Sequence, residues 1–232
     1  MNLMDLNNIA KYLDLANHHQ EANPEDIKKV CEKVKKYGFH TAFVNGCYVS
    51  LAKEILGEEG KVGTVISFPL GQDSQDAKVV AAIDAVKNGA DELDVSMNVG
   101  LFKAGERERV QKEMEAIVMA AKGIKKSVII KFIIETGFLT GEEIKAASQL
   151  VLASGADFVK SNSGLGPRGA SLDDIRLIKE AVGGKIKIKA AGGIDTREEA
   201  LAFIEAGVDR IGTSHAVEIV EGINNGEKNG GE

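Results

Sequence analysis

The sequence predicts a single closed (β/α)8 barrel, the TIM barrel architecture. Strand-like and helix-like patterns alternate along the whole chain, and eight such units fit within residues 1–222. No Gly-x-Gly-x-x-Gly motif follows the first expected strand, which disfavours the main alternative, an open doubly wound sheet. The composition, 44% hydrophobic and 28% charged, is that of an ordinary globular chain with one sizeable core.

The strand-like patterns divide the chain at regular intervals. They cover residues 11–16, 39–45, 61–68, 90–98, 126–135, 156–163, 185–191 and 208–213. We expect one catalytic barrel domain over residues 1–222. The remaining residues, 223–232, are polar and rich in glycine, so we expect a mobile tail there.

The expected helices between these strands begin at capping sequences. Asn23-Pro24-Glu25-Asp26 supplies an N-cap, a proline at the first helical position and acids in the first turn. Thr140 with Glu143 and Thr196 with Glu199 fit the capping box. Several helices are expected to end at glycines, which accept the left-handed backbone of a C-cap. These glycines are Gly38, Gly57, Gly89, Gly155 and Gly207.

Composition also limits the partners and the location. The net charge of −6 disfavours nucleic acid as a partner. No apolar run approaches the roughly 18 residues of a membrane span, and the first residues lack the pattern of a signal peptide. Cys31 and Cys47 do not form a Cys-x-x-Cys motif, and two cysteines suit a reducing compartment. We therefore expect a cytoplasmic protein that binds neither membrane nor nucleic acid.

The four histidines do not predict a metal site. His18 and His19 are adjacent, so in an extended segment they would point to opposite faces. His40 and His215 lie in distant segments. We expect a protein without metal or other cofactor.

Lys160 is the first candidate catalytic residue. It follows Phe158 and Val159 near the end of an expected buried strand. Burial disfavours the charged ammonium and lowers the pKa of a lysine, which makes a neutral amine available. A neutral amine is the nucleophile that Schiff-base chemistry requires. The alternative is a lysine that extends out of the strand end into water.

Asp94 and Lys189 are expected to join Lys160 at the same end of the barrel. Strand alternation directs all three side chains inward, at a mouth that we expect to face solvent. Strands six and seven should lie about 4.8 Å apart, so Lys189 would favour the neutral form of Lys160. Asp94 would pair with the lysine that stays charged. Lys187 would add a further inward charge below Lys189. The alternatives are a surface lysine and a carboxylate bonded to the next strand.

Two glycine-rich segments predict a phosphate site beside these residues. They are Ala191-Gly192-Gly193-Ile194-Asp195 and Gly212-Thr213-Ser214-His215, directly after the last two strands. Backbone N–H groups in such loops bind anions, and this is the usual phosphate position in these barrels. The alternative is that the glycines serve only tight turns. The predicted phosphate-binding residues are Gly164, Gly192, Gly193, Gly212 and Ser214. Arg168 could reach over the mouth, or it could be a solvated loop residue.

From Leu13 to Gly222 the chain resembles the deoxyribose-phosphate aldolase family. The resemblance implies a class I aldolase, in which Lys160 forms an imine and Asp94 and Lys189 form a proton relay helped by Asp14. The implied reaction cleaves 2-deoxyribose 5-phosphate to acetaldehyde and glyceraldehyde 3-phosphate. The matching segments are Val44-Asn45-Gly46-Cys47-Tyr48-Val49, Phe68-Pro69-Leu70-Gly71, Glu92-Leu93-Asp94 with Asn98, Ile134-Glu135-Thr136, Asp157-Phe158-Val159-Lys160-Ser161-Asn162-Ser163-Gly164, Lys189-Ala190-Ala191-Gly192-Gly193-Ile194 and Arg210-Ile211-Gly212-Thr213-Ser214.

The chain also departs from the family pattern, and two other functions stay open. Ala16 stands where the family has threonine, Gly46 replaces a proline, Asn162 and His215 replace serines, and Arg168 replaces a glycine. One alternative is a related Schiff-base aldolase for a different phosphorylated sugar. The other is a phosphosugar-binding barrel without catalysis. The expected partner is a small phosphorylated sugar, and a homodimer or a homotetramer is open.

Overall fold

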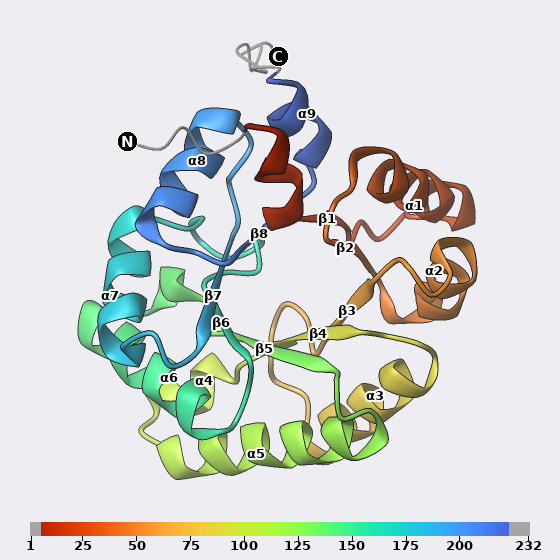
Figure 1. The fold of residues 1–232 in the computed structure, drawn as a ribbon. Helices are drawn as coiled ribbons and strands as arrows, with labels where there is room; N and C mark the ends of the chain where they lie inside the picture. Colours follow the sequence, from red (N-terminus) through yellow and green to blue (C-terminus); the bar gives the residue numbers. More distant parts are fainter. Residues whose placement is uncertain (1–5, 223–232) are drawn as a thin grey trace, which may run out of the picture.

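A computed structural model describes residues 6–222, which form a closed barrel of eight parallel strands in chain order (Figure 1). The last strand pairs back onto the first, with Asp14 opposite Gly212. This confirms the predicted barrel and excludes the open sheet. The expected tail at 223–232 lies outside the described residues. The strands are β1 (Leu13–Asn17), β2 (Thr41–Val44), β3 (Val62–Ile66), β4 (Glu92–Ser96), β5 (Ile129–Ile133), β6 (Phe158–Lys160), β7 (Lys187–Ala191) and β8 (Arg210–Thr213).

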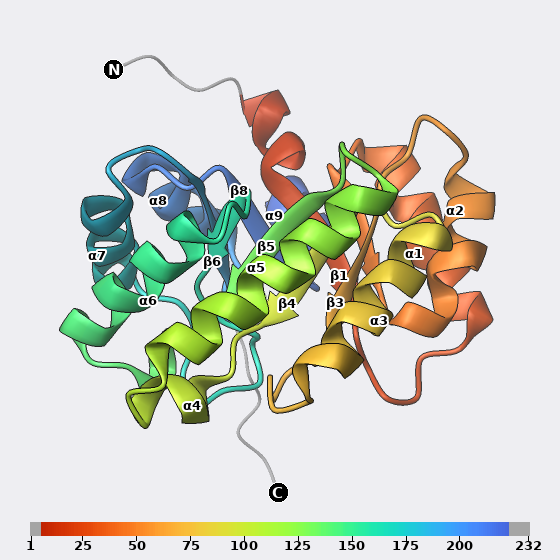
Figure 2. The ribbon, with the colours of Figure 1, turned by 90° about the horizontal axis from the view of Figure 1, so that it is seen from below.

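The helices surround the barrel, and α3 packs beside α5 on its outer surface (Figure 2). The helices are α1 (Pro24–Tyr37), α2 (Val49–Leu56), α3 (Gln75–Lys87), α4 (Val99–Lys103), α5 (Arg107–Ile124), α6 (Gly141–Ala153), α7 (Leu172–Val182), α8 (Arg197–Ala206) and α9 (Ala216–Glu221). Within residues 6–222 there are also three 3-10 segments. η1 (Leu6–Tyr12) precedes β1, η2 (Gly46–Tyr48) lies between β2 and α2, and η3 (Thr136–Phe138) lies between β5 and α6. Within residues 6–222, no helix is both long enough and apolar enough to cross a membrane.

The predicted helix starts are confirmed. The side chain of Asn23 accepts hydrogen bonds from the N–H groups of Glu25 and Asp26, and Thr140 and Thr196 form the two predicted capping boxes. Gly38, Gly57 and Gly207 cap helices as expected. The caps of α3 and α6 are instead Asn88 and Ser154, each one residue before the expected glycine.

The two faces of the strands differ in chemistry. Apolar strand residues such as Val95, Val159 and Ile188 are buried in the core shared with the surrounding helices. The inward residues next to them carry charge and contact one another across the barrel, from β4 to β6 and β7. Because an ion in a protein interior must be paired, this inner layer is where the chemistry of the molecule is concentrated.

Candidate active site

Asp94 is the centre of the charged inner layer. Its Oδ2 accepts hydrogen bonds from Lys160 Nζ at 2.8 Å and from Lys189 Nζ at 2.9 Å. Its Oδ1 accepts a third hydrogen bond, from Lys131 Nζ at 2.9 Å. The structure therefore brings together the three residues selected from the sequence and adds Lys131, which the sequence analysis missed.

Strand register explains why these side chains meet. Lys160 in β6 lies opposite Lys189 in β7, and Asp94 in β4 lies opposite Lys131 in β5. All four point inward because their apolar neighbours, such as Val95 and Phe132, face the helices. Lys131 carried a signal like that of Lys160, a lysine that follows an apolar residue in an expected buried strand, so strand alternation could have identified it.

The positions of Asp94 and Lys189 differ from the expectation in one respect. Their exposed fractions are 0% and 1%, so neither side chain faces solvent at the mouth. The reason is that Asp94 is covered by the three lysines, while the Lys189 ammonium also lies 3.8 Å from the centre of the Phe43 ring. These residues form the floor of the site.

The charges in this layer set the protonation states. Burial, reinforced by the positive charges of Lys189 and Lys131, lowers the pKa of Lys160 to about 8, although Asp94 acts in the opposite direction. Burial acts to raise the pKa of Asp94, but the three lysines outweigh it and hold that pKa well below its usual range. Asp94 is therefore a carboxylate, while part of Lys160 is a neutral amine near neutral pH.

Asp14 extends the layer through Lys189. Lys189 Nζ lies 2.7 Å from Asp14 Oδ2, so this ammonium bridges the carboxylates of Asp14 and Asp94. Burial raises the pKa of Asp14, and Lys189 only partly offsets this effect. A carboxyl group with a raised pKa beside Lys189 can take up a proton more readily than Asp94, which fits the expected helping role of Asp14.

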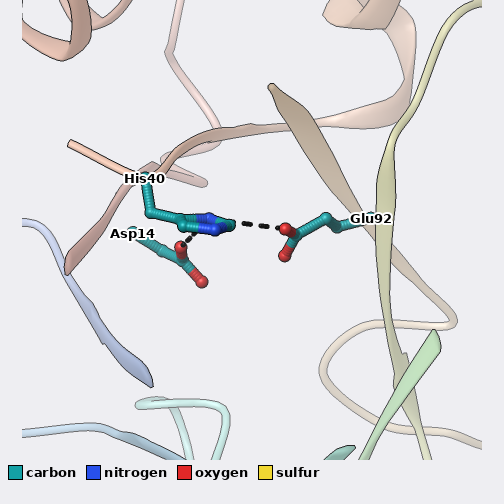
Figure 3. A group of neighbouring side chains, drawn as sticks. All are labelled: Asp14, His40 and Glu92. Atoms are coloured by element: carbon teal, nitrogen blue, oxygen red, sulfur yellow. Dashed lines mark ion pairs between the residues drawn. The ribbon is translucent and has the colours of Figure 1, made fainter. Parts of the chain in front are cut away.

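His40 lies between two of the buried carboxylates (Figure 3). Its Nδ1 is 3.8 Å from Asp14 Oδ1 and 3.5 Å from Glu92 Oε1, and one ligand atom of each residue lies within 4.8 Å of the others. The expectation that the histidines lie apart from such clusters is therefore wrong for His40. Sequence separation concealed this group, because its members come from β1, from the residue before β2 and from β4.

The charge balance around His40 disfavours a metal ion. Lys131 Nζ lies 2.5 Å from Glu92, and Lys189 Nζ and Arg210 Nε lie 2.7 and 3.6 Å from Asp14. Both carboxylates already have cationic partners, and a divalent cation would have to displace them or face their repulsion. The donor set of this group is therefore better suited to a buried ion-pair network than to metal coordination.

A cavity of about 290 Å³ opens above Lys160 and Lys189. All five residues predicted to bind phosphate line it. Gly164, Gly192 and Gly193 have φ angles of 89°, 96° and 70°, a region that favours glycine. A Cβ on Gly192 would lie 3.2 Å from Gly164 Cα, so a larger residue would require the loops after β6 and β7 to move apart by a few tenths of an ångström. The glycines therefore serve the turns and also leave the backbone open to the cavity.

Comparisons with known proteins agree with this geometry. Residues 7–221 match the DeoC/LacD family of aldolases. The chain belongs to this family. A deoxyribose-phosphate aldolase of Thermococcus gammatolerans is 47% identical over 222 residues, which cover 94% of this chain and 98% of that relative. One from Caldanaerobacter subterraneus subsp. tengcongensis is 44% identical over 217 residues, which cover 93% of this chain and 94% of that relative.

Solved structures show the same fold. An aldolase named QR15 superimposes with a TM-score of 0.87 at 39% identity, covering 92% of this chain and 94% of that one. The deoxyribose phosphate aldolase from Aeropyrum pernix, described as a unique tetrameric structure, gives a TM-score of 0.85 at 29% identity, covering 93% and 91%. Both comparisons span the whole barrel and the cavity of this DeoC/LacD family aldolase.

Most departures from the family pattern lie outside the cavity wall. Arg168 does not reach over the mouth, because it forms an ion pair with Asp174 and donates to the carbonyl of Thr136. Asn162 accepts a hydrogen bond from Thr136 Oγ1, and His215 Nδ1 lies 3.1 Å from Asp195 Oδ1. Of the two interpretations left open for Arg168, the structure therefore does not support the one in which it reaches over the mouth toward the phosphate site.

Two other residues noted in the sequence analysis, Ala16 and Lys187, differ in their position relative to the cavity. Ala16 lines it, as do His18, Phe43 and Phe68, which the sequence analysis did not select. Lys187 is exposed at the start of β7, away from the cavity, and its Nζ lies 5.7 Å from the centre of the Phe158 ring.

Proposed function

We propose that this chain cleaves 2-deoxy-D-ribose 5-phosphate reversibly to acetaldehyde and D-glyceraldehyde 3-phosphate, as a class I aldolase with an imine on Lys160. The observation that carries the proposal is the pair of lysines on Asp94 Oδ2 at the floor of the cavity. The family membership and the deoxyribose-phosphate aldolase activity for which the relatives are named support the same reaction.

The proposed mechanism begins with the neutral amine of Lys160. Its lone pair attacks the C1 carbonyl of the sugar, and loss of water forms a protonated imine. The C3 hydroxyl then gives its proton to the Asp94–Lys189 relay, with Asp14 behind Lys189. The C2–C3 bond breaks, and its electron pair moves into the imine to form an enamine. Protonation of the enamine carbon and hydrolysis of the imine release acetaldehyde and return Lys160.

The phosphate is proposed to bind at the opposite side of the cavity. The backbone N–H groups of the loops after β6, β7 and β8, at Gly164, Gly192, Gly193 and Gly212, and the hydroxyl of Ser214 would hold it. These groups line the same cavity as Lys160, so a single short phosphosugar can reach the amine and the loops together.

Imine trapping tests the proposal directly. Borohydride reduction with acetaldehyde should add one two-carbon unit, which peptide mass analysis should place on Lys160. Lys160→Met should abolish the adduct, while Lys187→Met, which removes an exposed lysine of the neighbouring strand, should not. An adduct on Lys189, or equal labelling of many lysines, would overturn the assignment. Trapping without turnover would favour the non-catalytic binding barrel.

The proposed chemistry requires no metal and no other cofactor, because the protonated imine itself accepts the electrons of the broken bond. Turnover should therefore persist after exhaustive treatment with EDTA. Loss of turnover that zinc restores would instead assign a metal to the Asp14, His40 and Glu92 group.

A related aldolase for a different phosphorylated sugar is the second candidate function. The observation that favours it is Ala16, which lies in the cavity wall where the family has threonine. A panel of pentose and deoxypentose phosphates, assayed for cleavage, would distinguish the two. A higher kcat/KM for another phosphosugar than for 2-deoxyribose 5-phosphate would support the second candidate.

The domain boundary, the location and the assembly are also proposals. We propose one catalytic domain over residues 1–222, a cytoplasmic location, and a homodimer or homotetramer. The tetramer of the Aeropyrum pernix relative supports assembly, as do exposed apolar side chains. Sedimentation velocity would give the stoichiometry. Among the described residues, the exposed large apolar side chains are Leu70, Val80, Met119, Ile124, Phe138 and Leu165.

A further inference from the structure

His18 lies in the cavity wall just after the end of β1. Its ring centre is 5.3 Å from that of Phe68 and 6.4 Å from that of Phe43, which it meets edge-on. The Lys160 ammonium lies 5.9 Å from the centre of the same Phe68 ring. The two aromatic side chains thus hold the imidazole in one orientation, close to the amine that forms the imine.

The Nδ1 atom of His18 is buried and has no hydrogen-bond partner. Other polar groups of the wall are occupied: Thr213 Oγ1 donates to the carbonyl of Ile194, and Ser163 Oγ accepts from the N–H of Leu165. Among the cavity-lining residues that the structure describes, His18 alone has a buried side-chain polar atom without such a partner. Buried polar atoms are nearly always paired. Because no partner among the described residues fixes Nδ1 and the His18 ring lines the cavity, the imidazole is available to a polar group of the ligand.

The imidazole of His18 is neutral. Burial and the positive charges of Lys160 and Lys189 lower its pKa to about 3, while Asp94 and the Asn45 side chain act in the opposite direction. A neutral imidazole has one donor and one acceptor nitrogen, which suits a hydroxyl group. An anionic phosphate would gain much less from it than from the glycine-rich loops, so a hydroxyl of the sugar is the better partner.

The position of His18 selects one hydroxyl. The sugar must extend from Lys160 to the loops after β7 and β8, and β1 is the neighbour of β8 in the barrel. His18 shares the Phe68 ring with Lys160 and also lies next to β8, so it lies beside the middle of the sugar. The C3 hydroxyl in that middle is already assigned to the proton relay of Asp94. The C4 hydroxyl, which becomes the C2 hydroxyl of glyceraldehyde 3-phosphate, has no other partner in the proposed complex.

We propose that His18 hydrogen-bonds this C4 hydroxyl and makes the enzyme selective for acceptor aldehydes that carry it. The inference rests on the proposed function and adds a specificity residue to the same site. His18 would take no part in the proton transfers, so its effect should appear in the choice between two acceptors rather than in the imine chemistry.

The test compares two acceptors in the condensation with acetaldehyde. One is D-glyceraldehyde 3-phosphate, and the other is 3-oxopropyl phosphate, which lacks only the hydroxyl. The wild type should prefer the first in kcat/KM. His18→Leu should reduce this preference by about tenfold, the effect of one net hydrogen bond. His18→Asn keeps an amide near the position of Nδ1 and should restore part of the preference.

Gln20→Leu is the matched control, because Gln20 lies in the same segment, its side chain is exposed and it does not line the cavity. It should leave the ratio of the two kcat/KM values unchanged. An unchanged ratio in His18→Leu, an equal loss for both acceptors, or an equal change in Gln20→Leu would each overturn the inference. A wild type that condenses neither acceptor would contradict the proposed function instead, so the two failures are distinguishable.

Discussion

Lys160 and Lys189 share a single oxygen atom, because both ammonium groups donate to Asp94 Oδ2, at 2.8 and 2.9 Å. They also lie directly opposite each other in the register of β6 and β7. The carboxylate holds two like charges side by side, so loss of a proton from one lysine relieves repulsion without leaving Asp94 unpaired. This arrangement joins the proposed nucleophile to its proton relay.

The activity should therefore depend on pH through Lys160. Below its pKa of about 8 the amine is protonated and cannot attack a carbonyl, so kcat/KM should fall about tenfold per pH unit. Above that pH the amine is neutral and kcat/KM should level off. Lys189→Leu removes a charge that lowers the pKa of Lys160, so that pKa should increase. The rise of kcat/KM should then occur at higher pH. A flat profile between pH 6 and 9 would contradict this prediction.

Asp94→Asn and Lys189→Leu should each lower turnover about 100-fold or more, since each removes part of the acid–base relay. Both side chains are buried, so stability must be measured as well. Asp94→Asn leaves three lysines without their shared carboxylate and should cost about 3–5 kcal/mol of unfolding free energy. Steady-state rates, measured at a temperature where thermal melts show a folded protein, separate the two effects. A wild-type rate in Lys189→Leu would remove the support for the relay.

Lys131 is predicted to act as a positioning residue through Asp94. Its ammonium contacts Glu92 at 2.5 Å and Asp94 at 2.9 Å, and these contacts raise its own pKa against the effect of burial. Lys131→Met should leave both carboxylates underpaired, with a loss of about 3–5 kcal/mol in stability. The double variant with Glu92→Leu should recover part of that loss.

A second readout distinguishes positioning from packing. The charge of Lys131 lowers the pKa of Lys160, so Lys131→Met should raise that pKa. The rise of kcat/KM with pH should therefore move to higher pH. A Lys131→Met enzyme that is less stable but has an unshifted profile would assign Lys131 to structure alone.

The sequence was sufficient to predict the barrel and the inward direction of Asp94, Lys160 and Lys189 on β4, β6 and β7, and these are the features that place the three residues at one site. It was not sufficient to show which inward charges meet, since that depends on the stagger between strands. Lys131 shares a register position with Asp94, and His40 reaches two carboxylates from other strands. The position of Arg168 depends on a loop conformation, which local sequence patterns do not determine.

The last prediction concerns the phosphate. Hydrogen bonds to a charged acceptor are worth roughly 1.5–3 kcal/mol each, so two at the low end would favour 2-deoxyribose 5-phosphate over 2-deoxyribose about a hundredfold in kcat/KM. Gly193→Val should reduce this preference, because Gly193 lines the cavity at a φ of 70° that valine does not adopt easily. Arg168→Ala should leave the preference unchanged, since Arg168 is bound to Asp174 outside the cavity wall. Kinetics on both sugars with each variant provide the measurement. Equal kcat/KM values for the two sugars in the wild type would rule out the phosphate site. If Arg168→Ala reduced the preference for the 5-phosphate as much as Gly193→Val does, the phosphate site would instead have to be placed nearer the loop after β6.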